Sequence, residues 1–267
     1  QTDIDFHDVS DQAGVSFRDQ LDEGALFTDF DLDGDYDLIV SYLEPTVGNR
    51  IYDNQGDGSF LLTDPEIITN WFAGVGLGLS AEDWDNDGDM DLSTRQFFRK
   101  NLLMETGEAT YWFFNHTMDV NHLSSATPAW GDWDKDGDLD GIIGNWLSVG
   151  HLYDNKLYDA DTPAGSKRHV RVHVVRDKSS VPNGTETEFG ASVEITVHGP
   201  GADGYRRKKF VASGHGYLNQ NEYGLHFALP ADPFPGNPSQ DVHFDIAVDF
   251  PTREDQGLWR VDKHVNA

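Results

Sequence analysis

The second half of the chain alternates apolar and polar residues with the period of two that is typical of β-strands. The clearest cases are residues 169–175 (HVRVHVV) and 191–197 (ASVEITV). Every second side chain of a strand points to the same face, so this pattern predicts strands that are buried on one side. Residues 208–212, 225–229 and 242–250 continue the series. Glycine and proline separate these segments, and we predict an antiparallel, β-sandwich-like region of five or six strands.

The first half shows a different pattern, in which a dense acidic stretch leads into a short apolar one. It occurs as FTDFDLDGDYDLIV at 27–40, AEDWDNDGDMDL at 81–92 and WGDWDKDGDLDGII at 130–143. The copies start 54 and 49 residues apart, a period typical of propeller blades. A second strand-like segment follows each copy, at residues 51–60, 97–101 and 152–155. The first half is therefore predicted to contain three β-repeats, each with one acidic loop.

Each acidic loop has the pattern DxDxDGDxD, whose residues are numbered below as loop positions 1 to 9. Side chains at positions 1, 3, 5 and 9 can converge on one point, the carbonyl at position 7 can add an oxygen, and glycine at position 6 permits a sharp turn. The predicted ligands are Asp29, Asp31, Asp33 and Asp37 with the Asp35 carbonyl, then Asp83, Asp85, Asp87 and Asp91 with the Asp89 carbonyl, then Asp132, Asp134, Asp136 and Asp140 with the Asp138 carbonyl.

The donor set favours calcium, and we predict three Ca²⁺ sites. Ca²⁺ accepts six or more oxygens at flexible distances, Mg²⁺ retains more water, and Zn²⁺ prefers imidazole or thiolate. A solvated acidic turn is the simpler alternative, but four carboxylates in one turn repel one another unless a cation lies between them. An EF-hand would need Glu at position 12, where this chain has Val40, Thr94 and Ile143.

Composition narrows the classes of partner. The 267 residues include 47 Asp and Glu against 19 Lys and Arg, a formal charge of −28, which disfavours nucleic acid and anionic lipid. Three Ca²⁺ would add six positive charges and leave about −22. Cysteine is absent, which excludes disulfides and thiolate sites. No apolar run is long enough for membrane insertion, and we interpret the start at Gln1 as the mature end of a secreted protein.

The three acidic repeats resemble FG-GAP/VCBS repeats in their loops, in the spacing of those loops and in the phrase GDGSF at 56–60. The resemblance covers residues 1–162 and implies calcium-binding, propeller-type blades in an all-β fold. Three blades are fewer than the four or more that close a propeller, so an incomplete propeller is expected.

Residues 166–267 are similar to the ASPIC/UnbV domain, through FGASVEITV at 189–197, GHGYLNQN at 214–221 and LHFAL at 225–229. Together the two resemblances imply a chain similar to cartilage acidic proteins. The composition changes after residues 161–165 (DTPAG), where we place the boundary between the repeats and the second β domain.

Several other residues carry separate predictions. Loop position 2 is aromatic in all three repeats (Phe30, Trp84 and Trp133), which we interpret as packing between blades rather than as a carbohydrate platform. The histidines of the C-terminal strands (His169, His173, His226 and His243) match no catalytic template and are expected to face solvent. Asn115 and Asn183 begin glycosylation sequons.

These patterns lead us to expect a secreted or cell-surface calcium-binding structural protein for adhesion, matrix assembly or self-association, with filaments forming through open sheet edges. The expected partners are calcium, further copies of the chain, or an extracellular protein or glycan. No catalytic or cofactor-binding residue is predicted. A calcium-dependent polysaccharide-acting enzyme and a lectin remain open as alternatives.

Overall fold

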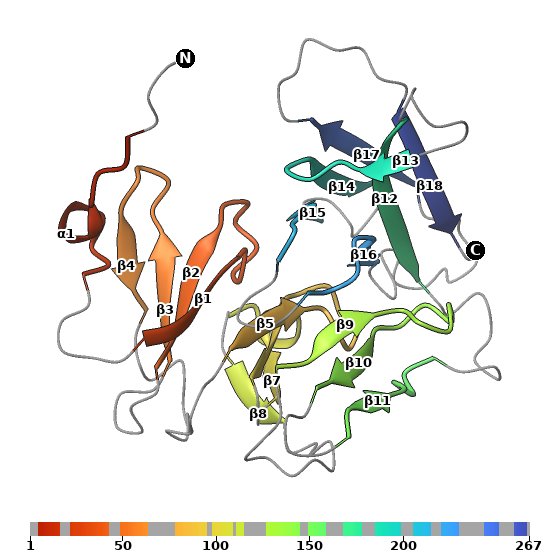
Figure 1. Ribbon diagram of the computed structural model, residues 1–267, viewed down its shortest axis with the longest axis horizontal. Helices are drawn as coiled ribbons and strands as arrows, with labels where there is room; N and C mark the ends of the chain where they lie inside the picture. The colour runs from red at the N-terminus through yellow and green to blue at the C-terminus, as the bar shows by residue number, and fades with distance from the viewer. Residues whose placement is uncertain are drawn as a thin grey trace.

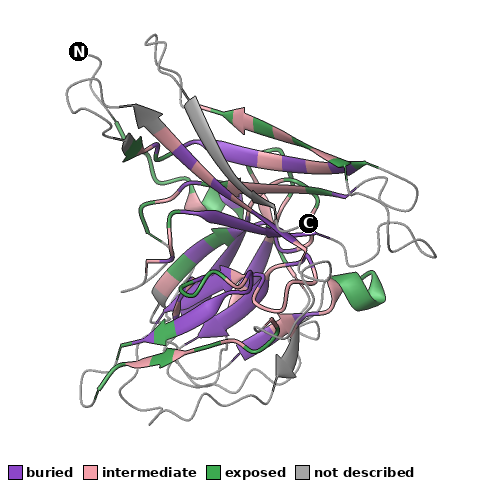
Figure 2. Cartoon of the chain, turned by 90° about the vertical axis from the view of Figure 1, so that its right-hand side faces the viewer, coloured by how far each residue is buried: buried purple, intermediate pink, exposed green. Residues whose placement is uncertain are grey.

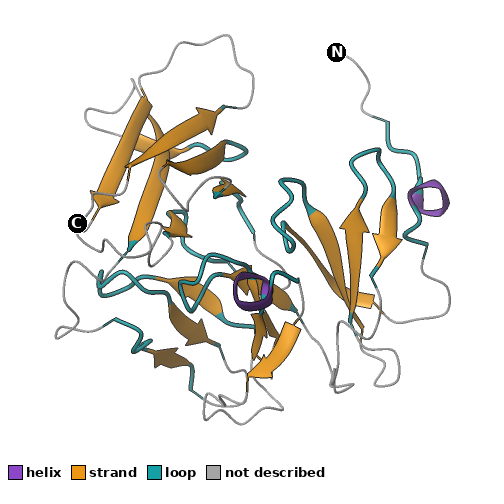
Figure 3. Cartoon of the chain, turned by 180° about the vertical axis from the view of Figure 1, so that it is seen from behind, coloured by secondary structure: helices purple, strands orange, loops and turns teal. Residues whose placement is uncertain are grey.

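A computed structural model has an all-β fold (Figures 1 and 3), and its described residues include two four-residue helices. It describes residues 5–16, 22–42, 49–63, 78–94, 98–108, 111–114, 127–144, 149–158, 168–177, 185–198, 205–214, 220–229, 243–250 and 259–265. The segment 161–165 and the sequons at Asn115 and Asn183 lie outside these residues. Among the described residues, no helix has the length and apolar character needed to cross a membrane.

Within the described residues, the acidic repeats form three separate antiparallel sheets, none of them closed. The first contains β1 (Asp22–Thr28), β2 (Asp37–Tyr42), β3 (Arg50–Asn54) and β4 (Phe60–Leu62), and follows α1 (Ser10–Ala13). The second contains β5 (Leu79–Glu82), β6 (Asp91–Thr94), β7 (Phe98–Asn101) and β8 (Tyr111–Phe114), with α2 (Leu103–Thr106) between β7 and β8. The third contains β9 (Ala129–Gly131), β10 (Asp140–Ile143) and β11 (His151–Tyr153). In each sheet the acidic loop connects the first strand to the second.

The three sheets stand side by side, with the first at the left of Figure 1 and the third at the lower right. Apolar side chains fill the first junction: Leu26, Phe30, Ile39 and Ile51 pack against Leu79, Ala81 and Leu92. At the second junction, Trp84 and Phe98 pack against Trp130 and Leu139. The aromatic residue at loop position 2 therefore packs against the next sheet in the first two repeats, as predicted.

The C-terminal strands form two more antiparallel sheets around a shared core. One contains β12 (His169–Asp177), β13 (Thr185–Thr187), β16 (Leu225–Ala228) and β18 (Trp259–Val265), and the other contains β14 (Ser192–His198), β15 (Arg206–Phe210) and β17 (His243–Asp249). The alternating valines of β12 and the apolar residues of β14 face each other in this core, which the period-two pattern predicted. Figure 2 shows the buried residues concentrated on these inner strands and on the inner strands of the repeats.

Candidate metal centres

The three acidic loops share one backbone conformation. The φ angles at loop position 4 are +63° at Leu32, +58° at Asn86 and +64° at Lys135, values that residues other than glycine rarely adopt. Glycine at position 6 has φ between +102° and +105° in every loop. The sequence predicted the need for glycine at position 6. The left-handed residue at position 4 was missed, because its identity differs from loop to loop.

Carboxylates converge in each loop. One oxygen from each of Asp29, Asp31 and Asp33 lies within 4.8 Å of the others in the first loop, and Asp132, Asp134 and Asp136 do the same in the third. The second loop forms two such groups, Asp83 with Asp85 and Asp91, and Asp87 with Asp89 and Glu105. Loop positions 1, 3 and 5 thus meet as expected in the first and third loops, and Glu105 is a cluster member that the loop pattern did not include.

The carboxylate at loop position 9 accepts backbone hydrogen bonds, in addition to its predicted role as a metal ligand. In the first loop the carboxylate of Asp37 accepts the backbone N–H of Phe30 at 3.0 Å and that of Asn54 at 2.9 Å. Asp140 accepts the N–H groups of Trp133 and Asn155 in the same way, at 3.1 and 2.8 Å. In the first and third repeats, the position 9 side chain therefore ties the start of its loop to the end of the third strand or to the residues directly after it.

In the second and third loops, the side chain at position 7 also holds the segment that follows the third strand of its sheet. Asp89 accepts the backbone N–H of Met104 at 3.0 Å, and Asp138 accepts that of Tyr158 at 2.6 Å. One carboxylate oxygen of each residue is engaged in this way, and the ligation of a cation by the backbone carbonyl at position 7 stays a prediction.

Buried carboxylate oxygens without a hydrogen-bond donor occur in all three loops. Among the described residues these oxygens are Asp29 Oδ1, Asp35 Oδ1, Asp85 Oδ1, Asp89 Oδ1, Asp91 Oδ2, Asp132 Oδ1 and Asp138 Oδ1. A buried carboxylate oxygen that lacks a partner is costly, and buried charges are normally paired or coordinate metals. The residues present therefore fit a hard, oxygen-binding cation.

Burial raises the pKa values of the same carboxylic acids. It raises the pKa to about 6 at Asp29 and Asp140, to about 7 at Asp37 and Asp89, and to about 8 at Asp138. Repulsion between neighbouring carboxylates adds to the effect, for example that of Asp31 and Asp33 on Asp29. Burial also raises the pKa of Asp83 and Asp91 far above the ordinary value. Each loop therefore concentrates negative charge where the protein supplies little to offset it.

The second loop differs because it contains an ammonium group. Lys100 on β7 forms ion pairs with Asp85, Asp87 (2.9 Å) and Glu105 (2.6 Å). Burial lowers the pKa of Lys100, but its hydrogen bonds with these three carboxylates raise it overall. The residues in the same place before the third-strand asparagine of the other repeats are Asp53 and Asp154.

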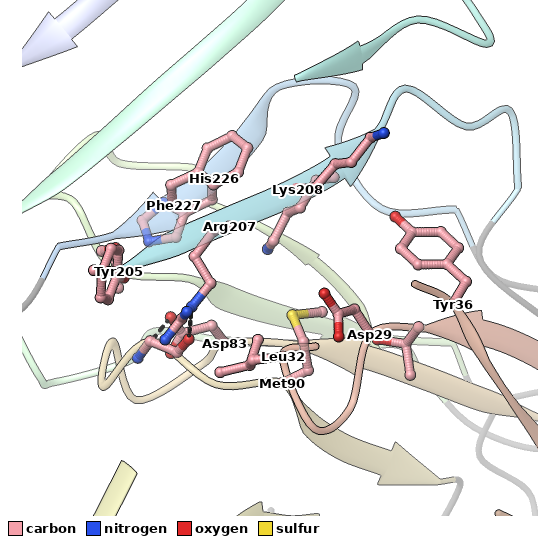
Figure 4. Close-up of a pocket in the computed structure, with 14 residues that line it drawn as sticks. Asp29, Leu32, Tyr36, Asp83, Met90, Tyr205, Arg207, Lys208, His226 and Phe227 are labelled. Atoms are coloured by element: carbon pink, nitrogen blue, oxygen red, sulfur yellow. Dashed lines mark hydrogen bonds between the residues drawn. The ribbon is translucent and has the colours of Figure 1, made fainter. Parts of the chain in front are cut away.

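Basic residues of β15 contact the second loop and β5, the strand that precedes it. Arg207 donates to the Gly88 carbonyl at 2.5 Å, and Lys209 pairs with Glu82 at 2.9 Å. Figure 4 shows Asp29, Asp83 and Arg207 around the pocket between these loops and β15 and β16. The run RRKK at 206–209 is the sequence signal from which this contact could have been predicted.

Two histidines of the C-terminal strands contradict the expected solvent exposure. His169 and His226 are buried, and their rings stack with centroids 5.4 Å apart. His226 Nε2 lies 2.6 Å from Asn86 Oδ1, and burial holds the pKa of His226 well below its usual value. The period-two pattern places these residues on one face correctly, but that face packs on the acidic loops. His243, by contrast, is exposed as expected.

Loop position 2 behaves differently in the third repeat. Phe30 is buried and Trp84 is packed between sheets, whereas the Trp133 side chain is exposed. The prediction of packing between blades is therefore wrong for Trp133, because the described residues include no fourth sheet with an acidic loop.

Comparison with known families matches the FG-GAP-like repeat to residues 29–93. The match includes the whole of the first and second acidic loops and ends in β6. No curated protein has significant similarity to the chain.

Proposed function

We propose that the acidic loops bind three Ca²⁺ ions and that the protein is a calcium-dependent structural or binding module rather than an enzyme. The observation that carries the proposal is the set of buried, unpaired carboxylate oxygens in three loops that share the same positive φ angles at positions 4 and 6. Asp29, Asp31 and Asp33 would hold the ion in the first loop, and their counterparts would do so in the others. The ion would supply the positive charge that these carboxylates lack.

On this proposal the three loop-bearing sheets are blades of an incomplete propeller, and the C-terminal sheets are an ASPIC/UnbV-like domain. Support comes from the FG-GAP-like match at residues 29–93 and from the blade-like order of strands in each sheet. The acidic composition accords with a secreted protein that works in adhesion, matrix assembly or self-association.

Calcium would act by linkage. The unfolded chain cannot assemble the loops, so an ion that binds only the folded state stabilises it by RT ln(1 + [Ca²⁺]/Kd). At a hundredfold excess over Kd one site contributes about 2.7 kcal/mol, or about 5–10 °C in melting temperature for a chain of this size.

The experiment is a calcium titration of the full chain by calorimetry, with melting temperatures measured in calcium, in magnesium and with a chelator. Asp31→Asn and Asp134→Asn each remove one loop carboxylate and should each weaken one site at least tenfold. Asp57→Asn is the control, because Asp57 lies in the turn before β4 and its carboxylate accepts hydrogen bonds from Ser59. Equal melting temperatures in calcium and in chelator would refute the proposal.

A polysaccharide-acting enzyme or a lectin is the alternative from another class. The carboxylate pairs that could serve a glycosidase lie in the acidic loops, and the same pairs occur in all three. Repetition favours a structural ion over a reaction centre. Turnover of a glycan panel, or glycan binding without turnover, would favour the enzyme or the lectin respectively.

A further inference from the structure

Equivalent residues of the three repeats form one face of each sheet. The face consists of loop position 2 and of a cross-strand pair between the second and third strands. The pair is Ile39 with Ile51 in the first sheet, Ser93 with Phe98 in the second, and Ile142 with Leu152 in the third. We call this the leading face, because it contacts the next sheet along the chain.

Where another loop-bearing sheet follows along the chain, that sheet buries the leading face. Phe30, Ile39 and Ile51 of the first sheet are 3%, 0% and 0% exposed. In the third sheet the same positions are taken by Trp133, Ile142 and Leu152, which are 57%, 54% and 52% exposed. Three large apolar side chains are therefore exposed to solvent at positions that form a junction between sheets in the first repeat. Such an exposed apolar cluster is typical of a protein interaction site.

A repeated hydrogen bond accompanies each junction between sheets. The Asn101 side-chain amide, at the end of β7, donates to the Phe30 carbonyl of the preceding loop at 2.9 Å. Asn155, which follows β11, donates in the same way to the Trp84 carbonyl at 2.8 Å. The equivalent acceptor in the third repeat is the carbonyl of Trp133. Among the described residues, no side-chain amide donates to it.

The donor that would continue the series is at the opposite end of the row. Asn54 occupies in the first sheet the place of Asn101 and Asn155, and its side-chain amide donates to the Tyr36 carbonyl of its own loop. Asn101 and Asn155 make that same bond within their own repeats and the additional one to the preceding loop. The amide of Asn54 thus has one hydrogen-bonding direction left for an acceptor outside its sheet.

The opposite face of the first sheet, here the trailing face, is also partly exposed. Phe27 lies on this face, in β1. The equivalent residues, Ala81 of the second sheet and Trp130 of the third, are buried against the preceding sheet. Phe27 is 57% exposed. Val15 packs on the cluster of Leu38, Val40 and Tyr52 and so covers this face at β2 and β3. The accessible part of the face is β1.

We propose that the leading face of the third sheet binds the trailing face of the first sheet in a second copy of this chain. Trp133, Ile142 and Leu152 of one copy pack against Phe27 of the other, and Asn54 of that copy donates to the Trp133 carbonyl. The contact repeats the two junctions within the chain. Because it joins different faces, it is heterologous and produces a ring if it closes and a filament if it does not.

The first test is sedimentation velocity of the full chain in millimolar calcium over a series of concentrations. This inference rests on the self-association part of the proposed function, so calcium binding is measured in parallel by calorimetry. We expect the average mass of the parent chain to increase with concentration. Trp133→Asp and Ile142→Asp should each weaken this association at least tenfold. Phe189→Asp is the matched control, because Phe189 is exposed on the C-terminal region and belongs to neither face.

A second test does not depend on those variants. The chain has no cysteine, so Asn54→Cys and Trp133→Cys can be prepared as separate chains and mixed with a short bis-maleimide. The mixed dimer should form at least tenfold faster than either homodimer. A chain that stays monomeric at every concentration, or that forms homodimers as fast as mixed dimers, overturns the proposed contact. Normal calcium binding in that same chain would leave the proposed function intact.

Discussion

The ammonium group of Lys100 lies 2.9 Å from the carboxylate of Asp87, in the place that Asp53 and Asp154 occupy in the other two repeats. The second loop therefore contains a positive charge of its own. Since a bound cation and Lys100 compete for the same carboxylates, the second loop should be the weakest of the three calcium sites.

Replacing Lys100 should strengthen calcium binding at the second loop. In Lys100→Met the carboxylates of Asp85, Asp87 and Glu105 lose their partner, and we expect calcium affinity at one site to rise at least tenfold by calorimetry. Without calcium the variant should be less stable than the parent by about 1–3 kcal/mol. Lys156→Met is the control: Lys156 pairs with Asp154 beside the third loop and is mostly exposed, so its loss should change neither quantity. Unchanged affinities in Lys100→Met would contradict the prediction.

The stability of the calcium-free protein should fall as pH rises. Asp29, Asp37, Asp89, Asp138 and Asp140 have pKa values raised to about 6–8, so between pH 4 and 8 the folded state binds more protons than the unfolded state. The free energy of unfolding therefore decreases through this range when a chelator is present. Saturating calcium should remove this decline, because the ion replaces the protons. Denaturant midpoints at several pH values, with chelator and with calcium, measure the difference.

Gly34 and Gly137 provide a matched pair of substitutions. Both have φ near +100°, so alanine at either position is strained by about 1–2 kcal/mol. A Cβ at Gly34 meets no atom within 4 Å, whereas one at Gly137 would lie 2.2 Å from the His169 ring. Gly137→Ala should therefore lower the free energy of unfolding by a further amount of about 1–3 kcal/mol. Equal loss of stability in the two variants, measured by urea denaturation, would show that β12 does not pack on the third loop as described.

The ion pair of Lys209 with Glu82 should show the behaviour of a buried pair. Both side chains are mostly buried, and Glu82 also accepts a hydrogen bond from Asn221 at 2.9 Å. Lys209→Met should lower stability by about 2–4 kcal/mol, because it leaves a buried carboxylate without its cation. The double variant with Glu82→Gln should recover part of that loss. Additive effects in this double-mutant cycle would contradict the contact between β15 and the second sheet.

Local features of the fold could be predicted from the sequence, because they depend on neighbouring residues. The strand character of β12 and β14 follows from alternation, and the convergence of Asp29, Asp31 and Asp33 follows from spacing around a glycine turn. The FG-GAP-like resemblance was confirmed for residues 29–93.

Contacts between distant segments could not be predicted in this way. His226 lies 140 residues from Asn86, and Arg207 lies 119 from Gly88, so neither pairing leaves a periodic signal in the sequence. Burial of His169 and His226 was missed for the same reason: alternation identifies which residues share a strand face, but not what covers that face. Glu105 and Lys100 were missed because they join the second loop from outside the DxDxDGDxD pattern.

Asn86 joins two of the loops directly. Its side-chain amide donates to the Gly137 carbonyl at 3.1 Å while its backbone forms the left-handed turn at loop position 4. Leu32 at the same position of the first loop has no amide to offer. An ion that orders the second loop would therefore also favour the ordered third loop, and we expect these two sites to fill cooperatively while the first loop saturates independently.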